Sequence, residues 1–428
     1  MKFTTKTGPH LVSSRASEGR GGAVSSVDNT RALSRWSGGD FLGAKLLVFF
    51  LPLSTVAGPR IHITWLGIGD FRVQDFLLAL AVVWFLLAQL RGLPALLPRA
   101  PQAGFVALVA LAGLTILFYA TGLAGAFETF YSLRLIQAPL IAIVVFYSIA
   151  IIGITGVKLF LLAATLGAIS NIFWVWAQLS LASFRPLWGV TKEVVVQYGP
   201  ALLGEPGAYP AGQALVILLA GALSFLTFPA FKTPYRLVIL FVLILNLSIA
   251  LVAINSRVTI AIGFGFIVII VTALTRPPLF ILAPATLCLA AALGNIPRLS
   301  SATVVADVRH RVESIYIPVI NNLGEGLGFW LGAGPGRSRA MLGVELHSLY
   351  VAVLSDFGFV GLVASLAAVY LALRSLRQSL SEPTDHWLQA FALWSLLTLL
   401  AILLTGFVQS SHISATPIHL SAAVFGVY

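Results

Sequence analysis

Long apolar runs separated by short polar breaks fill the chain from residue 41 onward. A membrane-spanning helix needs about 20 mostly apolar residues to cross a hydrocarbon core about 30 Å thick. The runs predict about twelve such helices, over residues 41–57, 73–90, 103–122, 131–153, 157–178, 211–228, 237–254, 258–275, 278–294, 348–372, 387–406 and 412–428. The pattern therefore predicts an all-α polytopic membrane protein.

The polar segments between these runs divide the chain into regions. Residues 1–40 are rich in Ser, Gly and Arg and contain no apolar run, which predicts a disordered cytoplasmic tail and no cleavable signal peptide. Residues 41–294 carry the first nine expected helices, with an external loop at 179–210. Residues 295–347 form a large external loop, in which the spacing of apolar residues predicts an amphipathic helix on or near the membrane face. Residues 348–428 carry the last three helices.

The basic residues set the expected orientation. If the tail lies inside, the inner loops are "RGLPALLPRAPQ", "GITGVK", "FPAFKTPYR", "TRPP" and "RSLRQSLSEPTDH". Each carries Lys or Arg, as the positive-inside rule expects, and both termini are then cytoplasmic. The net charge of +11 is explained by this placement and by anionic lipid headgroups, so it does not require nucleic acid as a partner.

Composition agrees with the membrane class and limits the chemistry. Hydrophobic residues make up 58% of the chain and charged residues 10%, with a mean hydropathy of +0.96. The single cysteine, Cys288, excludes an intrachain disulfide and a cysteine-based metal site. The acidic residues on the outer segments form no Asp-x-Asp or similar pair, which favours a reaction without a divalent metal.

Arginine dominates the basic residues on the predicted outer segments, where Lys192 is the single lysine. A guanidinium offers a planar fork of donors suited to phosphate and stays charged when it is partly desolvated. We therefore expect an outward-facing site for a phosphate or diphosphate group. Arg134 and Arg257 lie at the outer ends of their spans, where an ionisable residue is costly and is a functional candidate. The alternative is that each side chain reaches up to the lipid headgroups.

The segment "LGAGPGRSRAMLGVELHSLYVAVLSDFGFVGLVASL" resembles the signature region of the O-antigen ligase and O-antigen polymerase superfamily. The matching features are a Gly-rich step, a His, an acidic residue and a Gly-x-x-Gly step. They fall at Gly332, Gly334, His347, Ser348, Asp356, Gly358 and Gly361. "NSRVTIAIG", with Arg257, and "GEPG", with Glu205, are also similar to segments of that family.

Two departures from the family pattern concern the subfamily. An aromatic residue, typically Trp, often follows the Arg of the large loop closely, whereas Tyr316 is the nearest aromatic after Arg311. Ser348 also replaces a common Asn.

The resemblance implies a glycosyltransferase of the bacterial inner membrane. Such an enzyme takes a glycan from undecaprenyl diphosphate on the periplasmic side. It passes the glycan to a lipid A core sugar, as a ligase, or to another carrier-linked glycan, as a polymerase. No cofactor is implied, and the partners are the lipid-linked donor, the acceptor glycan and membrane lipids. The "GEPG" step leans toward polymerase, and the other motifs suit either.

Roles for individual residues follow from this chemistry. We expect Arg134, Arg257, Arg309 and Arg311 to bind the diphosphate and stabilise its departing negative charge. His347 is the expected base for the acceptor hydroxyl. The alternative is that His347 only begins the helix and is hydrogen-bonded to the backbone. Glu205 is a second candidate base, and an exposed carboxylate beside a proline turn is as good an explanation.

The remaining motif residues are expected to be structural. Nine residues of helix place Asp356 opposite His347 and deeper in the membrane, so Asp356 needs a buried partner or a proton. Gly358 and Gly361 are expected to permit close helix packing. The loop "GAGPG" lacks the Lys-Ser/Thr of a phosphate-binding P-loop and is expected to be a flexible turn.

Two functions of other classes remain open. A transporter or flippase of an anionic lipid-linked substrate would also use many spans and buried arginines. Transporters commonly carry internal repeats, and no second copy of the "NSR" segment occurs here. A non-catalytic assembly partner would have no reason to gather Arg257, Glu205 and His347 on one side of the membrane.

Overall fold

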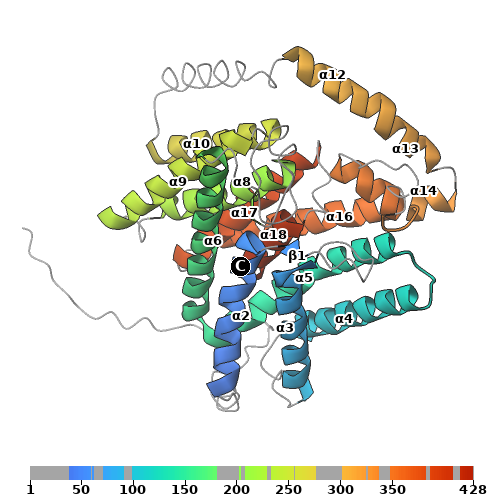
Figure 1. Cartoon of the computed structure of the whole chain (residues 1–428), viewed down its shortest axis with the longest axis horizontal. Helices are drawn as coiled ribbons and strands as arrows, with labels where there is room; N and C mark the ends of the chain where they lie inside the picture. Colours follow the sequence, from blue (N-terminus) through green and yellow to red (C-terminus); the bar gives the residue numbers. More distant parts are fainter. Residues whose placement is uncertain are drawn as a thin grey trace, which may run out of the picture.

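Figure 1 shows the fold of the chain in a computed structural model. The structure describes residues 38–58, 60–61, 71–90, 99–180, 202–203, 208–228, 233–254, 256–275, 301–323, 326–336, 348–381, 386–407 and 415–427.

Helices account for nearly all of the described residues. In the first half they are α2 (Gly38–Ala57), α3 (Val73–Leu90), α4 (Arg99–Ala120), α5 (Ala126–Ile152), α6 (Ile154–Ser180) and α8 (Ala208–Thr227). In the second half they are α9 (Pro234–Ile254), α10 (Arg257–Thr275), α12 (Ser301–Arg311), the π-helical turn η5 (Val312–Tyr316), α13 (Ile317–Asn322), α14 (Leu327–Leu331), α16 (Leu349–Ser381), α17 (His386–Gly406) and α18 (Ala415–Val427). A two-residue antiparallel ladder joins β1 (Arg60–Ile61) to β2 (Phe71–Arg72).

The all-α membrane class is confirmed. Within the described residues, 7 helices are long and apolar enough to cross a membrane, namely α4, α5, α6, α8, α9, α16 and α17. Shorter apolar helices lie in α2, α3, α10 and α18. A helix is found at each expected span except 278–294, which lies outside the described residues. The count of twelve therefore stays a prediction.

The helix α16 continues past its expected end at residue 372. Its last turns stay helical to Ser381 because Leu376 is buried against Ala392 and Leu399 of α17. The hydropathy of the sequence marks the apolar part of this helix and cannot show that a polar extension packs on its neighbour.

α8 lies at the centre of the helical core. In its apolar segment 83% of the residues are buried, and it packs against α9, α10, α17 and α18. α4 is the opposite case, since 6% of its apolar segment is buried and its main neighbour is α5. In Figure 1, α4 runs beside α5 at the lower right, away from the core. The exposed apolar side chains of α4 suit a surface in contact with lipid.

Small residues allow the central helices to approach closely. A side chain added at Gly167 of α6 would press on Val56 of α2. One added at Gly221 of α8 would press on the ring of Trp394 in α17, whose Nε1 donates to the carbonyl of Ile217 at 2.8 Å. Close contact at small residues is a main source of helix association in membranes.

Residues 301–322 of the segment expected to carry an amphipathic helix are helical, as α12, η5 and α13, and are here named the arm. That this segment belongs to a large external loop stays a prediction. Figure 1 shows the arm running along the upper right of the molecule, apart from the core. Its contact with the core is made near its end, where Val319 and Ile315 pack against Ala352 and Val351 of α16.

Candidate functional site

Polar side chains tie together the helix ends that the charge pattern assigns to the outer face. The starts of α3, α5, α8, α16 and α18 and the end of α17 all take part. The contacts are Arg134 with Asp75, Arg72 with Thr416, Gln74 with His419, Tyr131 with Asp356, Gln213 with Thr405 and Tyr350 with the carbonyl of Leu403. These ends therefore lie together in the fold, and the membrane face they occupy stays a prediction.

The centre of this region is an ion pair between α5 and α3. Arg134 places Nη1 at 3.0 Å from Oδ1 of Asp75 and Nη2 at 3.2 Å from Oδ2. Nη1 also donates to Oε1 of Gln137 at 3.1 Å, and the guanidinium lies 4.8 Å from the centre of the Phe130 ring. Both charged side chains are buried. A two-point contact of this kind fixes the guanidinium plane.

A second buried arginine adjoins this pair. The backbone N–H of Arg72 donates to Oδ2 of Asp75 at 2.8 Å, so this first-turn carboxylate both satisfies the N–H that precedes α3 and holds Arg134. The Nη1 of Arg72 donates to Thr416 of α18, and the amide of Gln74 meets Nδ1 of His419 in the same helix. All four of these side chains are buried. We name the set Arg72, Gln74, Asp75, Arg134, Gln137, Thr416 and His419 the polar cluster.

The sequence identified Arg134 and missed most of its neighbours. Arg72 and Asp75 stand in "FRVQD", where a charged pair meets the start of an apolar run, and this position was a usable indication of a site. His419 lies in the apolar segment "TPIHLSAAV" and is fully buried. A buried histidine in an apolar segment is a functional candidate for the same reason as Arg134.

Asp356 is buried and has the partner that its depth requires. The hydroxyl of Tyr131 in α5 donates to Oδ2 of Asp356 at 2.7 Å. Tyr131 lies one helical turn before Arg134, so the bond links α16 to the same part of α5 that carries the polar cluster. This geometry agrees with a structural role for Asp356.

Gly358 differs from its expected role in helix packing. It interrupts α16 with φ 66° and ψ −169°, a left-handed conformation that L side chains rarely adopt. The break leaves carbonyls without their usual helical donors, and the loop after α14 supplies replacements. Ala333 N–H donates to the carbonyl of Ser355 at 2.8 Å, and Gly334 N–H donates to that of Asp356 at 3.0 Å.

The two chain segments interlock through glycines. A Cβ on Gly332 would lie 2.5 Å from the backbone of Asp356, and one on Gly358 would collide with the carbonyl of Trp330. The loop "GAGPG" is therefore docked on the break in α16. Gly361 is also tight, but a Cβ there would meet Phe357 of its own helix and no neighbouring helix.

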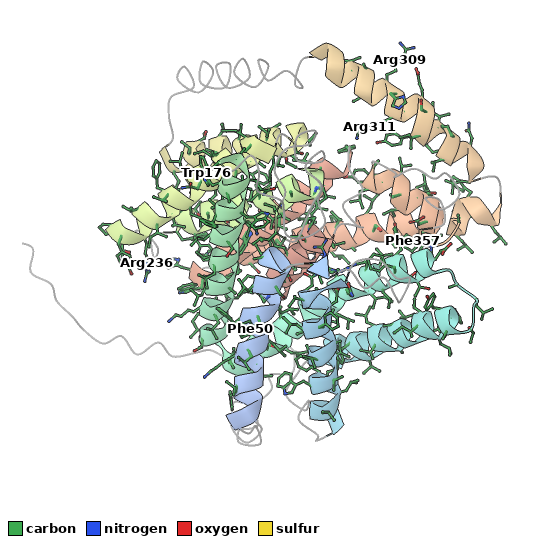
Figure 2. The ribbon with its side chains drawn as sticks, in the orientation of Figure 1. Phe50, Trp176, Arg236, Arg309, Arg311 and Phe357 are labelled. Atoms are coloured by element: carbon green, nitrogen blue, oxygen red, sulfur yellow. The ribbon has the colours of Figure 1, made fainter. Side chains whose placement is uncertain are left out.

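The two arginines of the arm face in opposite directions, as a separation of two residues on a helix requires. Arg309 is exposed and pairs with Glu313, with Nε at 2.8 Å from Oε1. Arg311 is 9% exposed although most described residues around it in the arm are exposed. Figure 2 labels both, and Arg311 lies on the side of the arm nearer the core. Of the two, Arg311 is the one placed to contribute to a site at the helix ends.

The other expected site residues fall at or beyond the limits of the described structure. Arg257 is the first residue of α10, and its side chain lies outside what the structure describes. Ser256 before it is buried, and its hydroxyl finds no hydrogen-bond partner in the part of the chain that the structure describes. His347 and Glu205 lie outside the described residues, one residue before the described Ser348 and two residues after Leu203.

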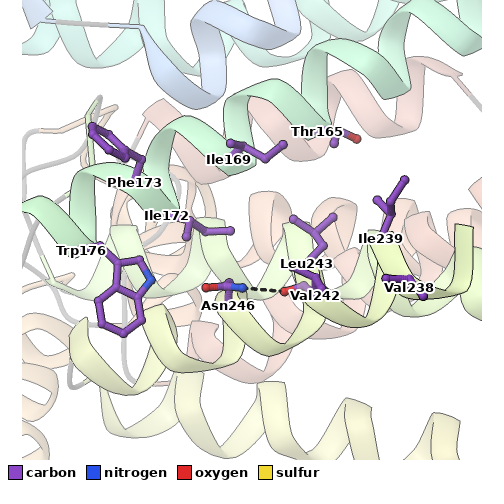
Figure 3. A pocket seen from close by; sticks show the side chains of 10 residues that line it. All are labelled: Thr165, Ile169, Ile172, Phe173, Trp176, Val238, Ile239, Val242, Leu243 and Asn246. Atoms are coloured by element: carbon purple, nitrogen blue, oxygen red, sulfur yellow. Dashed lines mark hydrogen bonds between the residues drawn. The ribbon is translucent and has the colours of Figure 1, made fainter. Parts of the chain in front are cut away.

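An apolar groove of about 590 Å³ lies between α6 and α9, away from the polar cluster. Figure 3 shows its lining, in which Ile172 and Trp176 of α6 lie toward Leu243 and Asn246 of α9. The Asn246 amide donates to the carbonyl of Val242 in its own helix at 2.9 Å. The groove offers apolar contact and no charged group, so it is not a diphosphate site.

Across the described ranges, no group of three or more His, Cys, Asp and Glu side chains is placed to hold a metal ion. The expectation of a metal-independent reaction is untouched by this observation and stays a prediction.

No protein-family model matches the chain, and no curated protein matches it. The likeness to the O-antigen ligase and polymerase superfamily therefore rests on the motif residues themselves.

Proposed function

We propose that the protein is a membrane glycosyltransferase that moves a glycan from undecaprenyl diphosphate to an acceptor sugar outside the cytoplasm, in the assembly of O-antigen or another exopolysaccharide. The proposal includes twelve membrane-spanning helices, cytoplasmic termini and residence in a bacterial inner membrane. It covers both a ligase, with a lipid A core acceptor, and a polymerase, with a carrier-linked acceptor.

The observation that carries the proposal is the burial of Arg72 and Arg134 where the predicted outer helix ends meet. Burying a guanidinium is costly, and in membrane proteins such residues commonly mark the path or site of a charged substrate. Here hydrogen bonds to Asp75, Gln137 and Thr416 hold both groups in place. Donors that are already oriented stabilise developing negative charge without reorganising during the reaction.

The donor chemistry assigns different tasks to the arginines. The acceptor hydroxyl oxygen forms a bond to the anomeric carbon of the glycan, and the bond from that carbon to the diphosphate oxygen breaks. The leaving undecaprenyl diphosphate gains negative charge, which Arg257 and Arg311 would meet directly. Arg134 is held by Asp75, so it would orient the local field or exchange partners when the diphosphate binds. Arg309 pairs with Glu313 on the exposed side of the arm, so it is not part of the proposed site.

The acceptor side requires a group that takes the hydroxyl proton. Neutral imidazole has an unperturbed pKa of about 6.5 and suits this role near neutral pH. His347 is the proposed base, with Glu205 as the second candidate. His347 precedes α16, whose first turns are tied to α17 through Tyr350 and to α5 through Asp356.

A transporter or flippase is the alternative that one observation favours. Transporters often contain membrane helices broken near their substrate sites, and α16 is broken at Gly358. Among the described helices, the break in α16 has no counterpart that would form the usual pair of interrupted segments. The glycosyltransferase proposal is therefore preferred.

The test is glycan transfer by the purified protein in lipid nanodiscs with an undecaprenyl-diphosphate-linked glycan. Arg311→Gln should lower the rate at least tenfold if it contacts the departing charge, and Arg309→Gln, its matched control on the same arm, should retain the rate. His347→Ala and Arg257→Ala should abolish transfer while the protein remains in the membrane. Equal rates for the two arm variants would contradict the site, and movement of an intact lipid-linked glycan between leaflets without transfer would favour the flippase.

The product in a deletion strain separates the two glycosyltransferase activities. Single repeats left on the carrier would indicate a lost polymerase, whereas long chains stranded on the carrier would indicate a lost ligase. Reporter fusions after residues 200, 256 and 320 should all report the outer side. A cytoplasmic result at any of them would exclude the mechanism.

A further inference from the structure

We propose that the short helix α14 inserts into the lipid bilayer beside the first half of α16 and anchors the large external loop there. This inference does not depend on the proposed function. It concerns the segment 326–336, "GLGFWLGAGPG", which contains no charged residue.

The side chains of α14 are apolar and open to the surroundings. The exposed fraction is 76% for Leu327, 51% for Trp330 and 60% for Leu331. Phe329 is also exposed. A contiguous apolar patch of this kind on a protein surface marks contact with another molecule or with a membrane.

The lipid surface of α16 continues directly into this patch. Phe359 stacks on Phe329, with ring centres 5.8 Å apart, and meets Trp330 edge-on at 5.6 Å. Phe359, Val360 and Val363 are exposed on the helix α16, which is long and apolar enough to cross the membrane. Where α16 crosses the membrane these three residues would face lipid, and α14 would share that environment.

The backbone of this segment is suited to the bilayer. Non-helical chain at membrane depth is tolerated where it packs against protein that satisfies its N–H and C=O groups. Gly332 N–H donates to the carbonyl of Gly328 at 2.9 Å within α14, and the N–H groups of Ala333 and Gly334 donate to carbonyls of α16. Gly326 and Gly332, both with positive φ, flank α14 at its two ends. The described part of the segment is therefore fixed to α16 through its own backbone.

Lipid is a better occupant than a second copy of the chain. The patch is continuous with a lipid-facing helix, and Trp at such a position is typical of the membrane interface.

Spin labels on single cysteines in a Cys288→Ala background test the position of α14 in proteoliposomes. Leu331→Cys carries the probe, Val363→Cys is the lipid reference and His310→Cys, on the exposed arm, is the aqueous reference. The Leu331 label should collide with oxygen as often as the Val363 label and with a water-soluble nickel chelate several-fold less than the His310 label. Collision with nickel equal to that at His310 would overturn the proposal, as would protection from both reagents, which would indicate a protein partner.

A second measurement does not need an introduced cysteine. Lipids brominated along their acyl chains should quench the fluorescence of Trp330. That fluorescence is obtained as the difference between the emission of the original protein and that of the Trp330→Phe variant. Trp176→Phe is the matched comparison, because Trp176 lines the open groove of α6 and α9 and is 40% exposed. A Trp330 component unaffected by brominated lipid, with a quenched Trp176 component, would refute insertion of α14.

Discussion

The ion pairs of Arg134 and Arg309 contain the same two chemical groups in different surroundings. The pair with Asp75 joins α5 to α3 and is buried, with side-chain exposures of 4% and 8%. The pair with Glu313 lies within the arm, with exposures of 74% and 56%. Water screens the second pair, and ordering two long side chains offsets much of its attraction. In the first pair, each charge depends on the other because neither can be rehydrated in place.

Substitution should separate these cases clearly. Arg134→Gln leaves the Asp75 carboxylate buried beside an amide and should lower the free energy of unfolding by about 3 to 5 kcal/mol. Arg309→Gln should lower it by about 0.5 kcal/mol or less. Reversible unfolding in mixed micelles measures both values. The double variant Arg134→Gln with Asp75→Asn should recover part of the loss, and equal effects of the two single changes would contradict the buried pairing.

The residue scale also shows what the sequence could not predict. Arg134 was identifiable because a charge within an apolar run is visible locally. Its partner Asp75 is 59 positions away, and Gln74 is 345 positions from His419. No local periodicity connects residues so far apart, because the packing of helices decides which of them meet.

Helices as elements were well predicted, whereas the break in α16 was not. The run "LYVAVLSDFGFVGLVASL" has helical spacing throughout, and its glycines suit close helix packing as well as a break. The break depends on "GAGPG" from outside the helix, whose N–H groups satisfy the carbonyls of Ser355 and Asp356. A pattern within α16 cannot show a donor supplied by another segment.

The interlocked glycines allow the free-energy cost of a strained backbone conformation to be distinguished from that of a steric collision. Gly334 has φ 101° with open space around it, so Gly334→Ala should cost only the left-handed conformation, about 1 to 2 kcal/mol. Gly358→Ala has a comparable conformational cost and also pushes a methyl group into the carbonyl of Trp330. Overpacking of this kind adds about 1 to 3 kcal/mol, so the total should be about 2 to 5 kcal/mol.

Thermal unfolding in detergent compares these variants. Gly332→Ala should resemble Gly358→Ala, because its added methyl group would press on the backbone of Asp356 from the other side of the interlock. If Gly334→Ala proved as harmful as Gly358→Ala, the docking of the loop on α16 would not be the source of the loss.

In the whole molecule, the most and the least apolar of the long helices differ sharply in burial. Of the seven long apolar helices in the described ranges, α8 has the lowest mean hydropathy and is 83% buried, whereas α9 has the highest and is 22% buried. Lipid-facing positions favour large aliphatic residues, and interior helices carry more Gly, Ala and Ser, which allow close approach. The segment "AYPAGQALVILLAGALSFLT" of α8 shows this composition. The many small residues in the α8 sequence therefore indicated a central helix, and a search for apolar runs alone does not use this information.

Helix α5 provides a test of how the whole molecule is placed in the membrane. An exposed residue lies just beyond each end of α5. Leu123 precedes the helix and is 76% exposed, and Ile154 follows it and is 46% exposed. The charge pattern places Leu123 outside and Ile154 inside. In a Cys288→Ala background, Leu123→Cys should react with a membrane-impermeant maleimide in right-side-out vesicles, and Ile154→Cys should react in inverted ones.

Two further positions provide matched controls for this labelling, because both are exposed and belong to other elements. His310→Cys of the arm should follow Leu123→Cys, and Tyr235→Cys at the start of α9 should follow Ile154→Cys. The polar contacts that join the starts of α3, α5, α16 and α18 place these helix ends on one side together. A reversed labelling pattern would therefore move the polar cluster to the cytoplasmic face and remove it from any reaction outside the cell. Labelling of Leu123→Cys and Ile154→Cys from the same side would instead show that α5 does not cross the membrane.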